Sequence, residues 1–180
     1  MLDSNIDNAL VKRAQAGETA VIGELYDRHQ DRIYRYIWSR VGNQQLAEDL
    51  TGDVFERMVA SLPSYQIGQT PFHAWLYQIA RNLIVDTYRK EEHRQTEPLE
   101  KAAAQPDGNV MVQTAVEQKW AVEQIHHALD AIDPLQREVI ILRFMVGMSL
   151  QEVALTLEKT VGAVKTLQHR GLKALRVALM

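Results

Sequence analysis

The chain contains no cysteine among its 180 residues. It therefore forms no disulfide bond, holds no thiolate-ligated zinc and has no cysteine nucleophile. It also lacks an apolar run approaching the roughly 20 residues that a membrane-spanning helix needs. The first residues, MLDSNIDNALVKR, are too polar for a secretory signal peptide. We accordingly expect a cytoplasmic protein with no direct membrane insertion.

The sequence is also poor in motifs that carry enzymatic chemistry. Its nine glycines form no phosphate-binding loop, and no G-x-S-x-G occurs. The six histidines lack metal-binding spacing, and the adjacent His126 and His127 must point to different sides of a helix. Asp49 and Asp53 share one helical face, which we interpret as exposed acidic surface because no base or metal motif accompanies them. The sequence predicts no catalytic residue, no metal and no cofactor, and hence a protein that is not an enzyme.

Apolar residues recur at helical spacing along most of the chain, and no alternating strand pattern is present. The fold class that this predicts is all-α, with two helical domains joined by a flexible linker. Prolines and a glycine interrupt the periodicity after the fourth helix, which places the domains at 1–93 and 112–180 and the linker at 94–111. The expected helices cover about 5–24, 22–41, 45–62, 72–90, 113–132 and 134–146, with two more after residue 149.

Cap and turn residues set several of these limits. Gly17 marks a break, Gly42 with Asn43 fits a helix end, and Pro63 ends the third helix. Asp133 is expected to be the N-cap of the helix that Pro134 opens and that Gly147 terminates. The side chains expected to supply that helix's core are Leu135, Val139, Leu142 and Phe144.

The segment from Ser149 to Met180 has the pattern of two helices joined by a short turn. Ser149 and Glu152 form a capping box, and Thr160 is the expected N-cap of the second helix. On a helical wheel, that helix has one apolar side and one basic side, and no acidic residue follows Glu158. Gln168 alone among the polar residues falls within the apolar side. This pattern fits a helix-turn-helix DNA reader, and it also fits an ordinary amphipathic helix with a solvated basic face.

The fourth expected helix carries Tyr77, Arg81 and Tyr88 on the face opposite its apolar stripe. If exposed, two tyrosines beside an arginine suit base stacking and phosphate contact on single-stranded nucleic acid. The alternative is that they pack against a neighbouring helix.

Five blocks in the chain, in this order, resemble the extracytoplasmic-function group of bacterial RNA polymerase sigma factors. The blocks are LYDRHQDRIYRYIWSRV, AEDLTGDVFERMVASL, TPFHAWLYQIARNLIVDTYRK, DPLQREVIILRF and VGAVKTLQHRGLKAL. The resemblance covers nearly all of residues 8–178. It implies a subunit of two domains, regions two and four, that binds core RNA polymerase and directs promoter-specific transcription initiation.

The resemblance also implies roles by position. The acidic helix 47–62 would contact the clamp helices of the polymerase's largest subunit, through Glu48, Asp49, Asp53 and Glu56. Complementary charge supports this, because the partner is expected to be basic. Gly52 departs from the family, which usually has a polar residue there. Either the clamp contact is weaker, or close backbone approach replaces the missing side chain.

The loop 65–70 and the helix after it resemble the element that melts the promoter and holds flipped bases of the minus-ten element. The residues implied are Tyr65, Gln66, Gln69, Thr70, Phe72, Trp75, Arg81 and Asn82, to which the stacking argument adds Tyr77 and Tyr88. Trp75 also lies on the apolar face, where core packing is the alternative.

The last helix resembles the reader of the minus-thirty-five element in the major groove. The residues at the corresponding positions are Thr160, Lys165, Thr166, His169, Arg170 and Lys173. Leu167 and Gln168 invert the commoner order, in which a basic residue precedes an apolar one. The linker resembles the segment that enters the polymerase active-site channel, and an anti-sigma factor is the expected inhibitory partner.

Two other classes of function fit parts of the pattern. One is a stand-alone helix-turn-helix transcriptional regulator with a helical sensor domain, which would not bind polymerase. The other is an interaction module that binds a sigma factor or its inhibitor, which would not need the basic face of the last helix.

Overall fold

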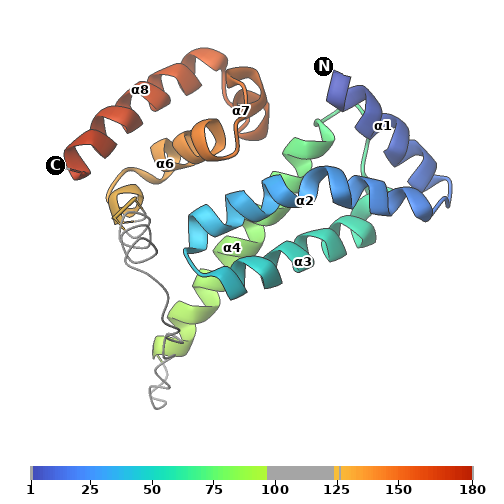
Figure 1. The fold of residues 1–180 in the computed structure, drawn as a ribbon, viewed down its shortest axis with the longest axis horizontal. Helices are drawn as coiled ribbons and strands as arrows, with labels where there is room; N and C mark the ends of the chain where they lie inside the picture. The colour runs from blue at the N-terminus through green and yellow to red at the C-terminus, as the bar shows by residue number, and fades with distance from the viewer. Residues whose placement is uncertain (1, 97–123, 126, 180) are drawn as a thin grey trace, which may run out of the picture.

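The structure, a computed structural model, describes residues 2–96, 124–125 and 127–179, and these residues form helices, turns and connecting loops without a β-strand (Figure 1). They divide into two helical lobes, in agreement with the predicted all-α fold of two helical domains. The first lobe holds α1 (Leu2–Gln15), α2 (Ala20–Val41), α3 (Gln44–Ser61), the 3₁₀ turn η1 (Leu62–Ser64) and α4 (Phe72–Thr96). The second holds α6 (Pro134–Ile140), the π-helical turn η2 (Ile141–Met145), α7 (Leu150–Thr156) and α8 (Val161–Ala178).

The first lobe is a bundle in which α2, α3 and α4 pack along one another. Gly42 has a left-handed φ of 65°, and its N–H donates to the Trp38 carbonyl at 2.9 Å, which ends α2 as predicted. Asn43 then caps α3, because its Oδ1 accepts from the Leu46 N–H at 2.9 Å. These two residues reverse the chain within a single turn. The side chains buried between the helices include Leu25, Ile33, Ile37, Leu50, Val54, Met58, Leu76 and Ile84.

α4 is longer than the sequence pattern predicts. It begins at Phe72 as expected but continues to Thr96 instead of ending near Lys90. Residues 94–96, which the sequence pattern places in the linker, are part of this helix. The helix can continue this far because no helix breaker occurs before Pro98. The rest of the expected linker, 97–111, and residues 113–123 of the next expected helix lie outside the described residues.

In the second lobe, Asp133 caps α6 as predicted, with Oδ1 accepting from the N–H groups of Leu135 at 3.0 Å and Gln136 at 3.1 Å. The helix then widens into η2, where the Val146 N–H donates to the Ile141 carbonyl at 3.1 Å. A π turn holds an extra residue and rotates the side chains that follow. The prediction of a core position for Phe144 is wrong for this reason: the residue is 54% exposed and lies against the Arg143 guanidinium.

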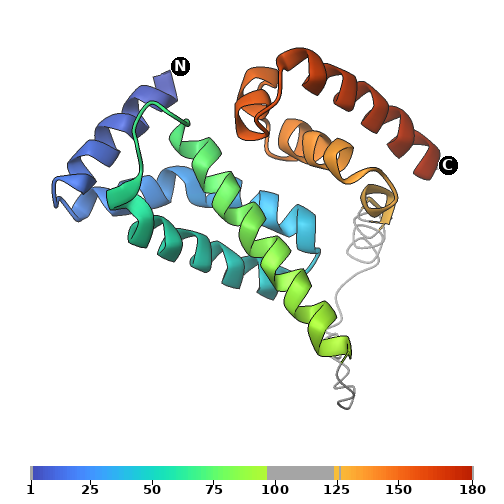
Figure 2. The same cartoon turned by 180° about the vertical axis from the view of Figure 1, so that it is seen from behind.

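The two lobes lie against each other in the structure. η2 packs against α2, and α7 packs against α4, while α8 lies beyond α6 on the outer side (Figures 1 and 2). The buried apolar side chains of both lobes form one connected cluster. The second lobe therefore covers part of the surface of the first.

Candidate nucleic-acid interface

The loop before α4 is held in place by hydrogen bonds. The Tyr65 hydroxyl donates to the Thr70 carbonyl at 2.6 Å, so the two ends of the loop are tied together. From α1, the Gln15 side-chain amide donates to the carbonyls of Leu62 at 2.9 Å and Tyr65 at 2.8 Å. Between Tyr65 and Thr70, the chain reverses at Gly68, which has a left-handed φ of 97°. A surface loop fixed in this way can present side chains without ordering itself on binding.

Aromatic rings support the loop from below. The Tyr65 ring lies 4.7 Å from the Trp75 ring and 5.7 Å from the Phe72 ring, measured between centroids. Phe72 is fully buried, so it supports the loop and its ring is not available to a base in this arrangement. Burial raises the pKa of the Tyr65 phenol, which stays neutral. Gln66 and Gln69 are exposed and hydrogen-bonded to each other.

The outer face of α4 differs from its predicted state at one tyrosine. Tyr77 was expected to be exposed but is only 3% exposed, because the second lobe and the Tyr36 ring cover it. The expected alternative, packing against a neighbouring helix, is the one observed. Arg81 and Asn82 are exposed. Tyr88 is 42% exposed, and its hydroxyl donates to the Arg40 carbonyl at 3.0 Å.

The acidic side chains of α3 form an exposed row. Glu48, Asp49, Asp53 and Glu56 are all exposed, and none takes part in an ion pair within the described part of the chain. Gln44 and Gln45 donate to Glu48 and Asp49 at 2.9 and 3.2 Å. A row of carboxylates without internal cations favours a basic partner.

Gly52 interrupts this row, and no atom lies within 4 Å of the place where its Cβ would be. Packing inside this chain therefore does not require a glycine here. The groove beside it runs between α2 and α3 and is lined in part by Tyr26, Tyr34 and Glu48.

The basic side of α8 is open to solvent. Lys165, Thr166, His169, Arg170 and Lys173 are all exposed, and Thr160 caps the helix by accepting from the Ala163 N–H at 3.1 Å. On the other side, Val164 and Gly171 are buried against the rest of the lobe. A Cβ on Gly171 would come within 3.1 Å of Ile140 Cγ1, so the glycine lets α8 approach α6 closely. The polar Gln168 is explained by Arg143, whose Nε donates to its Oε1 at 3.1 Å.

The helix-turn-helix geometry before α8 follows the predicted caps. Ser149 Oγ accepts from the Glu152 N–H at 3.2 Å, and Glu152 accepts in return from the Ser149 N–H at 2.7 Å. The turn bends at Glu158, a non-glycine residue with a left-handed φ of 53°. The Lys159 N–H donates back to the Ala154 carbonyl at 2.9 Å.

Two polar groups between or near the lobes were not predicted from the sequence. Glu138 on α6 is buried against Tyr36 and Arg40 of α2. Asp7 on α1 is buried against Arg28 and His29. For Glu138, the available signal was a carboxylate directly before an apolar run, since such a group must find a partner when buried. The sequence does not identify that partner. Tyr36, which donates to Glu138, lies 102 residues away in the chain.

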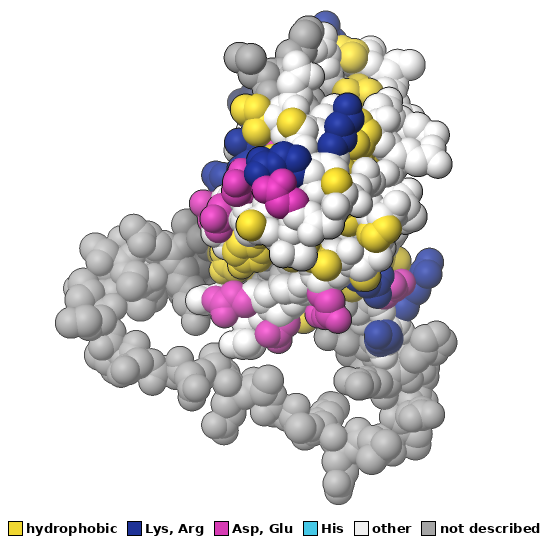
Figure 3. Space-filling view, turned by 90° about the vertical axis from the view of Figure 1, so that its right-hand side faces the viewer, with side chains coloured by type: hydrophobic (Ala, Val, Ile, Leu, Met, Phe, Trp, Pro, Cys, Tyr) yellow, Lys and Arg dark blue, Asp and Glu magenta, His cyan; other side chains and the backbone are white. Residues whose placement is uncertain are grey.

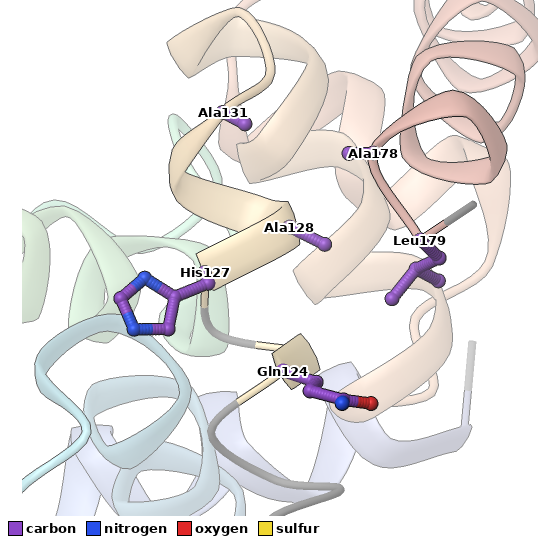
Figure 4. Close-up of a pocket in the computed structure, with 6 residues that line it drawn as sticks. All are labelled: Gln124, His127, Ala128, Ala131, Ala178 and Leu179. Atoms are coloured by element: carbon purple, nitrogen blue, oxygen red, sulfur yellow. The ribbon is translucent and has the colours of Figure 1, made fainter.

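Two of the cavities among the described residues carry polar side chains. One, near the end of α8, is lined by Gln124, His127, Leu179 and three alanines; the His127 ring points away from Ala178 (Figure 4). Another, of about 540 Å³ between the lobes, has Asp7 and Glu152 facing Arg28, Arg32, His29 and His73. Burial lowers the pKa of His73. Across the described residues, no group of three or more potential ligands could hold a metal ion.

The charges at the α1–α2 end of the molecule are mixed. Acidic and basic side chains alternate there with isolated hydrophobic ones (Figure 3), unlike the uniformly basic side of α8. In the described part of the chain, no helix is both long and apolar enough to span a bilayer.

Comparison with known proteins agrees with this arrangement. Residues 25–94 match the family model for Sigma-70 region 2, and residues 122–175 match that for Sigma-70 region 4. The chain is 35% identical to the ECF RNA polymerase sigma factor SigX of Bacillus subtilis, over 84% of this chain and 80% of that protein. The chain belongs to the ECF RNA polymerase sigma factors. It is also similar to the ECF sigma factor BldN of Streptomyces coelicolor, with 39% identity over 92% of this chain, but it spans only 63% of that protein's length.

Among solved structures, this ECF sigma factor is similar to CnrH, described in complex with the cytosolic domain of CnrY. The TM-score is 0.73 with 26% identity, and the match covers 96% of each chain. The similarity extends over both lobes, so the two-lobed helical fold is shared with that protein.

Proposed function

We propose that this chain binds core RNA polymerase in the cytoplasm and directs it to specific promoters. The acidic row on α3 contacts the clamp helices of the polymerase's largest subunit. The loop 65–70 and α4 melt and hold the minus-ten element, and α8 reads the minus-thirty-five element. The protein is not itself an enzyme in this proposal, since polymerase carries out the chemistry.

The observation that supports this best is the presence of two separate charged surfaces on one chain. The carboxylates of α3 have no cationic partner among the described residues, and the cations of α8 have no acidic neighbour after Glu158. A stand-alone DNA-binding regulator needs only the second surface. A sigma factor needs both, because it must bind polymerase and DNA at once.

The residues proposed to contact the minus-ten element stay predictions within this proposal. The loop and α4 residues proposed for the minus-ten element are Tyr65, Gln66, Gln69, Thr70, Trp75, Arg81, Asn82 and Tyr88. Tyr77 joins them only if the second lobe moves away, since that lobe covers it here.

The deciding experiment is in-vitro transcription with core polymerase on a promoter library. The expected result is initiation from a subset of promoters that share two elements, dependent on this chain. A reaction in which the chain neither binds core polymerase nor selects promoters would rule out the proposal and leave the stand-alone regulator as the better reading.

We further propose that an anti-sigma factor holds this chain inactive. CnrH, with which the fold is shared, was solved with the cytosolic domain of another protein bound. Purifying the tagged chain from its own cells, before and after stress, is expected to recover a stoichiometric inhibitor that blocks the transcription reaction.

A further inference from the structure

Glu138 makes its described polar contacts with the other lobe. The residue is 4% exposed. One carboxylate oxygen accepts a hydrogen bond from the Tyr36 hydroxyl, and the other lies 3.3 Å from Arg40 Nη1. A buried carboxylate is strongly destabilising without such partners. The C-terminal half of α2 is therefore an anion-binding site, filled here by a carboxylate.

This site has more hydrogen-bond donors than one carboxylate uses. The Nε and Nη1 atoms of Arg40 are buried without a hydrogen bond, although Nη1 is within ion-pair distance of Glu138. The Tyr77 hydroxyl is also buried without a hydrogen-bond partner, and its ring meets the Tyr36 ring edge-on at 5.2 Å. Buried donors are rarely left unsatisfied in proteins. The surplus fits an anion that accepts more hydrogen bonds at this site than Glu138 does.

The site also lies beside the face proposed to hold melted promoter DNA. Tyr77, Arg81 and Tyr88 follow one another along α4, and Tyr88 is hydrogen-bonded to the Arg40 backbone. A strand that stacked along this face would carry its phosphates past Arg40.

The closed arrangement cannot engage a whole promoter. The names minus-ten and minus-thirty-five place the two promoter elements about 25 base pairs apart, which is about 85 Å at 3.4 Å per base pair. A compact chain of 180 residues has a radius of gyration of only about 16 Å. The lobes must separate on the promoter, and separation removes Glu138 from Tyr36 and Arg40.

We propose that Tyr36, Arg40 and Tyr77 form a binding site for a backbone phosphate of the melted promoter strand, and that Glu138 takes the place of this phosphate while the lobes are closed. The inference rests on the proposed function and adds a contact on α2 to it. Closure and DNA binding then compete for the same side chains. Guanidinium and hydroxyl donors suit a phosphodiester, which offers charge and several acceptor oxygens.

The test measures binding of a fluorescent 12-nucleotide single-stranded DNA to the full chain, at several salt concentrations. Glu138→Gln removes the competing charge at nearly constant size, and we expect several-fold tighter binding. Adding Arg40→Gln should abolish that gain and reduce the slope of log K against log salt by about 0.7, the value for one phosphate contact on a single strand. Arg13→Gln is the control. It removes an arginine of α1 that is paired with Glu18, and it should leave the slope unchanged.

Because a change at the buried carboxylate could itself unfold the protein, a second and milder variant tests the same site. Tyr77→Phe removes only a hydroxyl that has no partner in the closed molecule. We expect its stability to urea to be equal or higher, and its binding to the single strand to be a few-fold weaker. A purely structural role for Tyr77 would leave DNA binding unchanged.

Several results would overturn the proposal. One is an unchanged affinity in Glu138→Gln, and another is a gain that survives Arg40→Gln with the same salt slope, which would make Glu138 a contact between lobes only. An equal gain for the blunt duplex of the same sequence would exclude the melted strand as the ligand. The proposed function is judged separately: a chain that supports transcription but fails these tests loses only this site, and a chain that passes them without binding polymerase keeps it.

Discussion

At the scale of single residues, Gly52 is the gap in the acidic row of α3. Glycine within a helix costs roughly 0.5–1 kcal/mol relative to alanine, and nothing surrounds the missing Cβ. We therefore expect Gly52→Ala to raise the free energy of unfolding by about that amount, measured by urea denaturation. Gly171→Ala is the matched control. It should not stabilise, because its Cβ would meet Ile140; equal gains at both positions would contradict the packing described.

Asp7 makes stability depend on pH. Burial alone would raise its pKa, but hydrogen bonds and charges from His29 and Arg28 bring the pKa below the ordinary value of 3.8. A carboxylate with a lowered pKa stabilises the fold fully above its unfolded pKa, and this contribution is lost as pH falls through the folded pKa. Asp7→Asn is expected to cost about 1–3 kcal/mol at pH 7.

The difference in free energy of unfolding between Asp7→Asn and the native chain should become smaller as the pH falls below about 4. Urea unfolding at a series of pH values measures this. Asp53→Asn, an exposed carboxylate outside the ion pairs described, serves as the control and should stay within about 0.5 kcal/mol of the native chain. A pH-independent difference for Asp7→Asn would show that its charge is not what stabilises the fold.

At the scale of the element, the proposed function places DNA binding on α8 and polymerase binding on α3. Lys165→Glu places an acid on the exposed basic side, where it repels phosphate. We expect weaker promoter binding by the polymerase complex and unchanged capture of core polymerase, for which the α3 surface is proposed. Lys12→Glu makes the same charge change on α1 and should affect neither. Loss of both activities in Lys165→Glu would show that the lobes do not act separately.

Caps and periodicity predicted most helices but not the faces they present. Ser149, Glu152, Thr160 and Asp133 cap as expected, because a capping motif is local in sequence. Phe144 was assigned to the wrong side, because a π turn changes the phase and has no clear sequence signal. The partner of Gln168 could not be predicted either, since Arg143 reaches it from another helix.

At the scale of the whole molecule, the closed lobes limit what the free chain can do. Both surfaces proposed to read DNA are small, and they cannot reach both promoter elements together while the lobes are closed. We expect only weak binding of a duplex promoter fragment by the chain alone, and tight binding once core polymerase is added. A gel-shift assay tests this, and specific nanomolar binding without core enzyme would contradict it.

The arrangement of the lobes is also the feature that local sequence patterns do not encode. The blocks of the chain indicated both lobes and their order, and the comparisons confirmed them. The contact of Glu138 with Tyr36 joins residues far apart in the chain and depends on how two folded units meet. The burial of Tyr77 is not encoded locally either, because its ring packs against Tyr36 of another helix. The roles of the individual DNA-contacting residues stay predictions.

Gln15 has a consequence for the evolution and engineering of the loop before α4. Its single amide group bridges two backbone carbonyls of the η1–loop junction, at Leu62 and Tyr65. α1 thus holds in place a segment that lies some fifty residues further along the chain. Trimming α1 would loosen this loop, and with it the proposed contact with promoter bases, without deleting any residue that is proposed to touch them. Under the proposed function, promoter preference therefore depends partly on a helix that carries none of the proposed DNA contacts.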